Sequence, residues 1–123
     1  ALIPGMFNFR ARQARRVITQ QVCQIFQEVD ALILPSSPTP APSLEATPHR
    51  NVREKVVGIR RTYTCLFNLT GHPALSVPCG FNSIGLPIGL QLVGRYFEDG
   101  LLFRIAHQYQ LNTNWQSNKP PFD

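Results

Sequence analysis

The sequence is poor in charged residues and lacks any long apolar run. Only 15% of its 123 residues are charged and 43% are hydrophobic, a balance close to that of an ordinary globular protein. Its longest uninterrupted apolar stretches are short, as at residues 31–34, so we expect no membrane-spanning helix. The chain begins at Ala1 without a start methionine or a signal peptide, which suggests a processed or truncated protein. Its length is that of a single domain.

Cysteine and histidine are scarce, and their spacing fits no metal site. No two cysteines form a CxxC pair, and none has zinc-finger spacing to a histidine. We therefore expect neither a metal nor another cofactor. In place of disulfides we expect the reduced thiols of a cytoplasmic protein. The six residues are Cys23, Cys65, Cys79, His49, His72 and His107.

Acidic residues are also few, and the formal net charge is +5. Most of the cationic side chains are arginines, and four of them lie close together near the beginning of the chain. Such a cluster can bind phosphate groups, lie in solvent on a helix, or face another part of a larger protein. Because no aromatic residues alternate with these arginines, we do not expect nucleic-acid binding. The four are Arg10, Arg12, Arg15 and Arg16.

The apolar residues recur with helical period over residues 5–29, which predicts a long amphipathic helix that needs a partner surface. Its apolar stripe consists of Ala14, Ile18, Val22, Ile25 and Val29. The short apolar run at 30–35 predicts a strand buried on both faces. The closely spaced prolines of residues 36–48 exclude a helix and predict an extended connector.

The second half of the chain combines helical segments with a β-hairpin. Periodicity predicts helices over residues 50–67 and 97–110. Two β segments, 74–78 and 87–93, flank a turn at 80–85 that is rich in glycine, asparagine and serine. A sheet buried on both faces needs helices on both sides, and this chain supplies little more than one such layer. The pattern therefore indicates a piece of a larger sheet.

Three blocks of the sequence resemble those of the amidase-signature family. DALILPSSP at 30–38 is similar to the family's strand and proline turn. FNLTGHPALSVPCGF at 67–81 resembles its last well-marked block, and GLPIGLQLVGR at 85–95 resembles its closing hairpin. Each block alone is a weak signal, whereas the three together in the family's order are specific.

The resemblance implies an α/β fold in which residues 1–111 are the C-terminal segment of the family's α/β/α domain. That segment has a mixed sheet with a β-hairpin and flanking helices, and residues 112–123 form a loose polar tail. The implied catalytic trio, two serines and a lysine, lies in sequence outside this chain. Lys55 and Lys119 are the only lysines, and neither lies in the family's lysine context. Ser36 and Ser37 belong to the proline turn and are not expected to be nucleophiles.

The motif residues have structural roles in this interpretation. Glycines bracket a strand, prolines lie at strand ends, and the amides of Asn68 and Gln91 are expected to be buried cross-links first and substrate contacts second. The set consists of Asn68, Gly71, Pro73, Pro78, Gly80 and Gln91. For substrate binding, the resemblance points to Arg61 and its neighbour Tyr63.

The resemblance implies an enzyme that hydrolyses the C–N bond of a carboxylic amide. One alternative is the A subunit of glutamine-dependent aminoacyl-tRNA amidotransferase, where an acidic residue at the position of Arg61 holds the substrate's ammonium group. An arginine cannot neutralise an ammonium, which favours a stand-alone amidase. A non-catalytic interaction module is an alternative of another class.

As a piece of a larger enzyme, this chain is expected to be inactive alone. Its expected partners are the missing N-terminal lobe of the same enzyme and, in the intact protein, a small amide substrate. Its unpaired strand edge and apolar helix stripe are expected to drive homo-oligomer formation, through the first helix or through the edge at 32–34. No membrane partner is expected.

Overall fold

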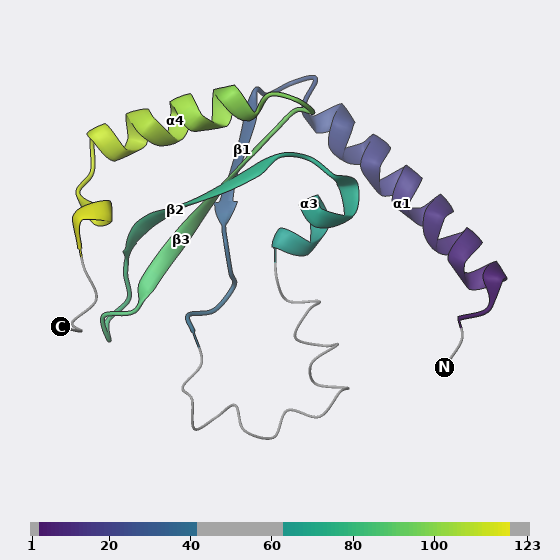
Figure 1. The fold of residues 1–123 in the computed structure, drawn as a ribbon, viewed down its shortest axis with the longest axis horizontal. Coiled ribbons are helices and arrows are strands. Elements are labelled where there is room, and N and C mark those ends of the chain that lie inside the picture. The colour runs from purple at the N-terminus through teal and green to yellow at the C-terminus, as the bar shows by residue number, and fades with distance from the viewer. Residues whose placement is uncertain (1–2, 42–62, 119–123) are drawn as a thin grey trace.

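The computed structural model describes residues 3–41 and 63–118, which contain one sheet and the helices around it. Figure 1 shows α4 at one side of the sheet, and α1 running away from the sheet toward the N-terminus. The elements, in chain order, are α1 (Gly5–Ile25), β1 (Ala31–Pro35), α3 (Thr64–Thr70), β2 (Ala74–Phe81), β3 (Pro87–Gly94), α4 (Asp99–Leu111) and the short 3-10 helix η1 (Trp115–Ser117).

The three strands form one antiparallel sheet in the order β1-β3-β2, so β3 lies between the other two. Leu32 of β1 and Ala74 of β2 both lie opposite Val93 of β3. β1 and β2 therefore do not pair with each other but each pairs with β3. The registers of these two pairings decide which side chains of β1 and β2 come close together.

The predicted hairpin joins β2 to β3 through a turn that the side chain of Asn82 stabilises. Its Oδ1 accepts hydrogen bonds from the backbone N–H groups of Ile84 at 3.1 Å and Leu86 at 2.8 Å. Gly85 has a φ of +80° in this turn, a left-handed conformation that glycine adopts without steric cost. The turn is thus specified by residues within it.

Consecutive residues of β3 point to opposite faces of the sheet, and each face has its own core. On the first face, hereafter the α1 face, Val93 packs against α1 and α3; on the second, the α4 face, Leu92 packs against α4. Burial of each such side chain stabilises the fold by about 1.5–3 kcal/mol. Helices on both faces confirm the α/β class with a hairpin and flanking helices, whereas the three described strands pair only antiparallel where a mixed sheet was expected. The two cores consist of Val22, Phe26, Phe67 and Val93, and of Val77, Leu92, Leu102 and Ala106.

Arg95 connects the end of α1 to the strands. Its Nε donates a hydrogen bond to the carbonyl oxygen of Phe26 at 2.9 Å, and one terminal nitrogen donates to the carbonyl oxygen of Val29 at 3.2 Å. The same nitrogen lies 3.1 Å from a carboxylate oxygen of Asp30, and the other terminal nitrogen lies 3.8 Å from Glu98. A planar guanidinium can make these contacts at once, so Arg95 fixes the turn between α1 and β1.

The first helix is shorter than predicted and buries a different stripe. It ends at Ile25 and is followed by a turn over residues 26–28. Val22 is buried as predicted, but the fully buried residue after it is Phe26, whose ring stacks on His72 at 5.2 Å. The turn directs the residues around Phe26 outward. The predicted stripe is therefore wrong at Ile25, which is exposed while Phe26 is buried. Ala14 and Val29 are exposed too, so the stripe has no partner surface at these positions among the described residues.

β1 is buried on one face only, so the prediction of burial on both faces is wrong for this chain. Leu32 and Leu34 pack against the core of the α1 face, whereas Ile33 is 63% exposed. The reason is that β1 is an edge strand, and α4 packs over β2 and β3.

The remaining helices and the tail differ from the predictions at their ends. Of the helix predicted at 50–67, residues 50–62 lie outside the described residues, and α3 extends from Thr64 to Thr70. α4 begins at Asp99, after Phe97 with its φ of +65°. In the predicted tail, Trp115 of η1 contacts Phe81 edge-on at 6.3 Å. No helix of the described ranges is long and apolar enough to cross a membrane.

Candidate functional site

On the α1 face, the apolar core gives way to polar side chains toward the hairpin turn. Ser76 of β2 and Gln91 of β3 lie there with Ser36, which directly follows β1, and we call the three residues the serine–glutamine strip. The backbone N–H of Ser36 donates to the carbonyl oxygen of Gly89 at 2.8 Å, which continues the β1–β3 pairing. The Ser36 and Ser76 hydroxyls are hydrogen bonded to each other at 2.7 Å. The strip thus holds a fixed pair of hydroxyl groups above β3.

Gly89 makes room for the two hydroxyl groups. A Cβ atom at this position would lie 2.8 Å from Ser36 Oγ and 3.1 Å from both Ser36 Cβ and Ser76 Oγ. Separations this short are below van der Waals contact, so a larger residue would push the two serines apart. A glycine inside a strand marks such a close approach.

Gln91 is the buried member of the strip. It is only 3% exposed, and its Oε1 atom accepts no hydrogen bond from the described residues. Buried polar atoms in proteins nearly always have a partner, and an unpaired one costs about 1–3 kcal/mol. We therefore expect a donor for Gln91 Oε1 from outside residues 3–41 and 63–118, and the cross-link predicted for Gln91 stays a prediction.

The described residues offer no base to activate a serine of the strip. Among the described residues, the Ser36 and Ser76 side chains bond only to each other, and Ser37 Oγ donates to the carbonyl oxygen of Thr39 at 2.8 Å within the proline turn. Both lysines of the chain lie outside the described ranges. Within those ranges, no three histidine, cysteine or acidic side chains are close enough to hold a metal ion. The strip therefore has no reactive centre among the described residues.

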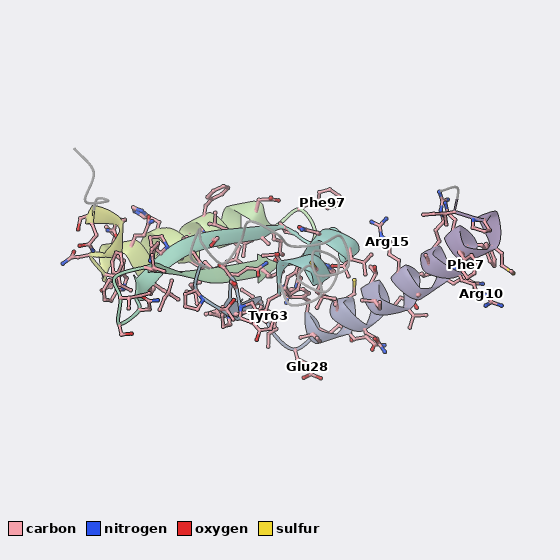
Figure 2. All side chains as sticks on the ribbon, turned by 90° about the horizontal axis from the view of Figure 1, so that it is seen from below. Phe7, Arg10, Arg15, Glu28, Tyr63 and Phe97 are labelled. Atoms are coloured by element: carbon pink, nitrogen blue, oxygen red, sulfur yellow. The ribbon has the colours of Figure 1, made fainter. Side chains whose placement is uncertain are left out.

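Of the two residues expected to contact substrate, the structure describes Tyr63. Arg61 lies outside the described residues. Tyr63 immediately precedes α3 and is 45% exposed, so its ring is accessible to a ligand; Figure 2 labels it. Asn68 is exposed on α3 and is not a buried amide.

The motif glycines and prolines occupy special backbone positions. Gly71 ends α3 with a φ of +79°, and its N–H donates to the carbonyl oxygen of Phe67 at 2.7 Å. Gly80 has a φ of +147° at the β-bulge that follows Pro78. The carbonyl oxygen of Pro73 accepts a hydrogen bond from Gly94 at 3.1 Å.

A chain of polar groups around His72 joins α1 to the segment after α3, and no pattern in the sequence signals it. His72 Nε2 lies 3.8 Å from Cys23 Sγ, and Nδ1 lies 2.9 Å from Thr70 Oγ1. The ring stacks between Phe26 and Tyr96, the latter at 4.3 Å. Burial lowers the pKa of His72, which favours the neutral ring. When Nδ1–H of the neutral ring donates to Thr70 Oγ1, Nε2 can accept a hydrogen bond from the Cys23 thiol.

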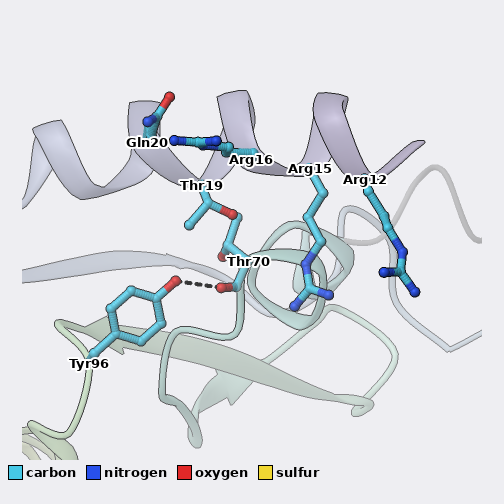
Figure 3. A pocket seen from close by; sticks show the side chains of 7 residues that line it. All are labelled: Arg12, Arg15, Arg16, Thr19, Gln20, Thr70 and Tyr96. Carbon is cyan, nitrogen blue, oxygen red and sulfur yellow. Dashed lines mark hydrogen bonds between the residues drawn. The ribbon is translucent and has the colours of Figure 1, made fainter. Parts of the chain in front are cut away.

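A groove of about 730 Å³ lies beside this chain of groups, and three arginines of the predicted cluster line it. Figure 3 shows Arg12 and Arg15 extending from α1 toward the segment that contains Thr70. The hydroxyl of Tyr96 donates to the carbonyl oxygen of Thr70 at 2.6 Å at the floor of this groove. The lining residues are Arg12, Arg15, Arg16, Thr19, Gln20, Thr70 and Tyr96.

Comparison with known proteins gives concordant results. A family model described as Amidase matches residues 5–103. The A subunit of glutamyl-tRNA(Gln) amidotransferase from Pseudomonas fluorescens (strain SBW25) is 40% identical over 123 residues, which cover 98% of this chain and 25% of that protein. Among solved structures, the same subunit from Thermotoga maritima has a TM-score of 0.68 and 35% identity over 81% of this chain and 21% of that chain. A 6-aminohexanoate cyclic dimer hydrolase complexed with substrate has a TM-score of 0.75 and 27% identity, covering 87% of this chain and 24% of that chain.

The matches cover nearly all of this chain but only a part of each related protein. The chain spans about a quarter of the length of the curated relatives it matches. The serine–glutamine strip and the groove both lie within the residues that the family model covers.

Proposed function

This chain belongs to the amidase family, and on that premise we propose that it forms the C-terminal part of an enzyme that hydrolyses carboxylic amides. The family match over residues 5–103 carries the proposal. It confirms the resemblance seen in three sequence blocks. The similarity to a cyclic dimer hydrolase supports hydrolysis as the reaction class. We place this enzyme in the cytoplasm, because its sparse cysteines are typical of reduced compartments.

The reactive groups belong to the polypeptide outside this chain. By the family's chemistry, a neutral lysine accepts the proton of the nucleophilic serine through a bridging serine, as the serine oxygen attacks the amide carbon. The C–N bond then breaks, the nitrogen leaves with that proton as an amine, and water hydrolyses the acyl-enzyme. The serine–glutamine strip of this chain forms part of the wall of the active site. There, the unpaired Gln91 Oε1 accepts a hydrogen bond from a group in the missing portion of the enzyme.

Arg61 and Tyr63 border the pocket of the intact enzyme in this proposal. The exposure of the Tyr63 ring, at the beginning of α3, supports it. An arginine at position 61 favours a carboxylate or a carbonyl group in the substrate and disfavours an ammonium group.

The A subunit of an amidotransferase is the second candidate. The observation that favours it is the 40% identity to proteins of that name. The stand-alone amidase comes first because Arg61 replaces the acidic residue that the amidotransferase's substrate requires. A non-catalytic interaction module is the third candidate. It requires a parent protein that has neither the Gly/Ser-rich block nor the upstream lysine of the catalytic enzymes.

The test uses the longer polypeptide that contains this segment. We expect it to hydrolyse simple aryl amides without partner subunits, and we expect the 123-residue chain alone to show no turnover. Amide formation on glutamyl-tRNA only in the presence of partner subunits, with no hydrolysis of aryl amides, would favour the second candidate instead.

The pocket assignment has its own variants. Tyr63→Ala in the longer polypeptide should change the ratio of kcat/KM values between bulky and small amides. Tyr109→Phe, on the α4 face, serves as the matched control and should leave that ratio unchanged. Equal ratios for Tyr63→Ala, Arg61→Ala and the unmodified enzyme would remove both residues from the pocket.

A further inference from the structure

The N-terminal part of α1 is exposed along its whole length. Every residue from 3 to 17 is exposed, and Figure 2 shows Phe7 and Arg10 far from the sheet. Four large apolar side chains of this part are more than half exposed. Isolated helices of this length are marginal in water, and exposed apolar residues in such number indicate a covered surface. The four are Met6 (60%), Phe7 (56%), Phe9 (63%) and Val17 (54%).

The same helix carries positive charge that nothing described neutralises. The ion pairs of the described residues involve Arg95 alone, and Arg12 bonds only to the uncharged Asn8, at 3.1 Å. No aspartate or glutamate occurs before Glu28, and none lines the groove. Three arginines and the Thr19 hydroxyl in one groove form a site for an anionic group.

Three occupants of this surface can be compared by charge and polarity. A second copy packed through α1 would bring arginine against arginine, because that helix has no acidic residue. Nucleic acid pairs with the arginines but leaves the large apolar side chains against a polar surface. A protein segment with both carboxylates and apolar residues satisfies both features.

We propose that the arginine groove and the exposed apolar side chains of α1 together bind an acidic, amphipathic segment of the same polypeptide, outside this chain. The proposal rests on the proposed function, in which this chain is one part of a longer enzyme. The curated relatives are about four times as long as the matched region, so they contain ample sequence to supply such a segment.

The geometry of the groove determines how that segment binds. Figure 3 shows Arg12 and Arg15 leaving α1 on the same side, with Arg15 nearer to Thr70, so one carboxylate entering between them accepts hydrogen bonds from two guanidinium groups. Thr19 supplies a hydroxyl from α1 on the same side. The apolar side chains of the segment then cover the first turns of α1.

A photo-cross-linking experiment on the longer polypeptide tests the proposal. We would incorporate p-benzoylphenylalanine in place of Gln20, which lines the groove and carries no charge, so that all arginines remain. Irradiation should join this position to a peptide outside residues 1–123 that contains aspartate or glutamate. A cross-link to a second copy, to nucleic acid, to a segment without carboxylates, or to nothing would overturn the proposal.

Charge-reversed variants provide the second measurement. Arg12→Glu with Arg15→Glu should lower the yield of that cross-link about tenfold or more, since close charge pairs commonly couple by more than one decade in affinity. Arg104→Glu on α4 is the matched control and should leave the yield unchanged. An unchanged cross-link yield in the double variant would overturn the role of the arginines. If the double variant does not fold, the photo-cross-linking result with all arginines intact decides whether the proposal stands. Amide hydrolysis is assayed separately, so a cross-link in an inactive protein would refute the enzyme and leave the docking site standing.

Discussion

Gly89→Ala is the smallest change that tests the geometry of the serine–glutamine strip. The new methyl group would lie 2.8 Å from Ser36 Oγ and 3.1 Å from Ser76 Oγ. Because the Cβ atom of Ser36 is also 3.1 Å away, rotation of its hydroxyl cannot relieve the whole contact. The hydrogen bond of 2.7 Å between the two serines must therefore break or the strands must shift.

The magnitude follows from three opposing contributions. Overpacking a close contact costs about 1–3 kcal/mol, and losing the hydroxyl pair costs about 0.5–1.5 kcal/mol. Replacing a glycine by alanine restricts the unfolded chain, which returns about 0.4–1 kcal/mol. The steric term is the largest, so we expect a net destabilisation of about 1–3 kcal/mol.

Urea unfolding of the 123-residue chain, followed by circular dichroism, measures this effect. The midpoint should fall by roughly 0.5–1.5 M for a chain of this size. Gly100→Ala, in the first turn of α4, is the matched control. Outside the helix's own backbone and the two neighbouring residues, no heavy atom lies within 4 Å of its new methyl group, so it should raise stability. In a background with Ser36→Ala and Ser76→Ala, the cost of Gly89→Ala should fall by about 1 kcal/mol. An unchanged cost in that background would refute the reasoning.

Three further predictions concern pH, the contacts of Arg95 and association. Burial lowers the pKa of His72, so the unfolded chain binds this proton more readily than the folded chain does. The contribution of the neutral ring to the free energy of unfolding should be fully present above about pH 6.5 and should fall as the pH drops below that value. In urea melts, His72→Gln should flatten this dependence on pH. Arg95→Ala removes two hydrogen bonds to backbone carbonyls and should lower the free energy of unfolding by about 1–3 kcal/mol. Asp30→Ala removes only an exposed ion pair and should cost less than about 1 kcal/mol; equal losses would contradict this assignment. The isolated chain should form oligomers through the outer edge of β1 and the exposed Ile33, and Ile33→Lys should shift it toward monomer in light scattering. Monomeric unmodified chain at micromolar concentration with a cooperative melt would argue against that interface.

The hairpin is predictable from the sequence because its information is local. Asn82 supplies the acceptor for two backbone N–H groups, and Gly85 supplies the left-handed conformation. The serine–glutamine strip is not predictable in this way. Ser36 and Ser76 are 40 residues apart and meet only because β1 and β2 both pair with β3. Gly89, a glycine within a strand, is the one local sign that two side chains approach the backbone there.

The buried face of α1 shows a second limit of sequence patterns. Ile25 and Phe26 lie three and four residues after Val22, so helical period alone allows either of them to be buried. The choice depends on His72, whose ring stacks on Phe26 and which comes from a distant part of the chain. Periodicity locates the helix, and a tertiary contact decides which residues of its last turn are inside.

The α1 face and the α4 face of the sheet differ in how many of their side chains find partners within this chain. On the α4 face, α4 packs over β2 and β3 and encloses an apolar core. On the α1 face, Gln91 lacks a hydrogen-bond donor at one end, and the arginines of α1 lack a carboxylate at the other, among the residues that the structure describes. A polypeptide that carries both an N–H or O–H donor and acidic side chains can meet both needs at once. The α1 face is therefore where we expect the rest of the enzyme to join this chain.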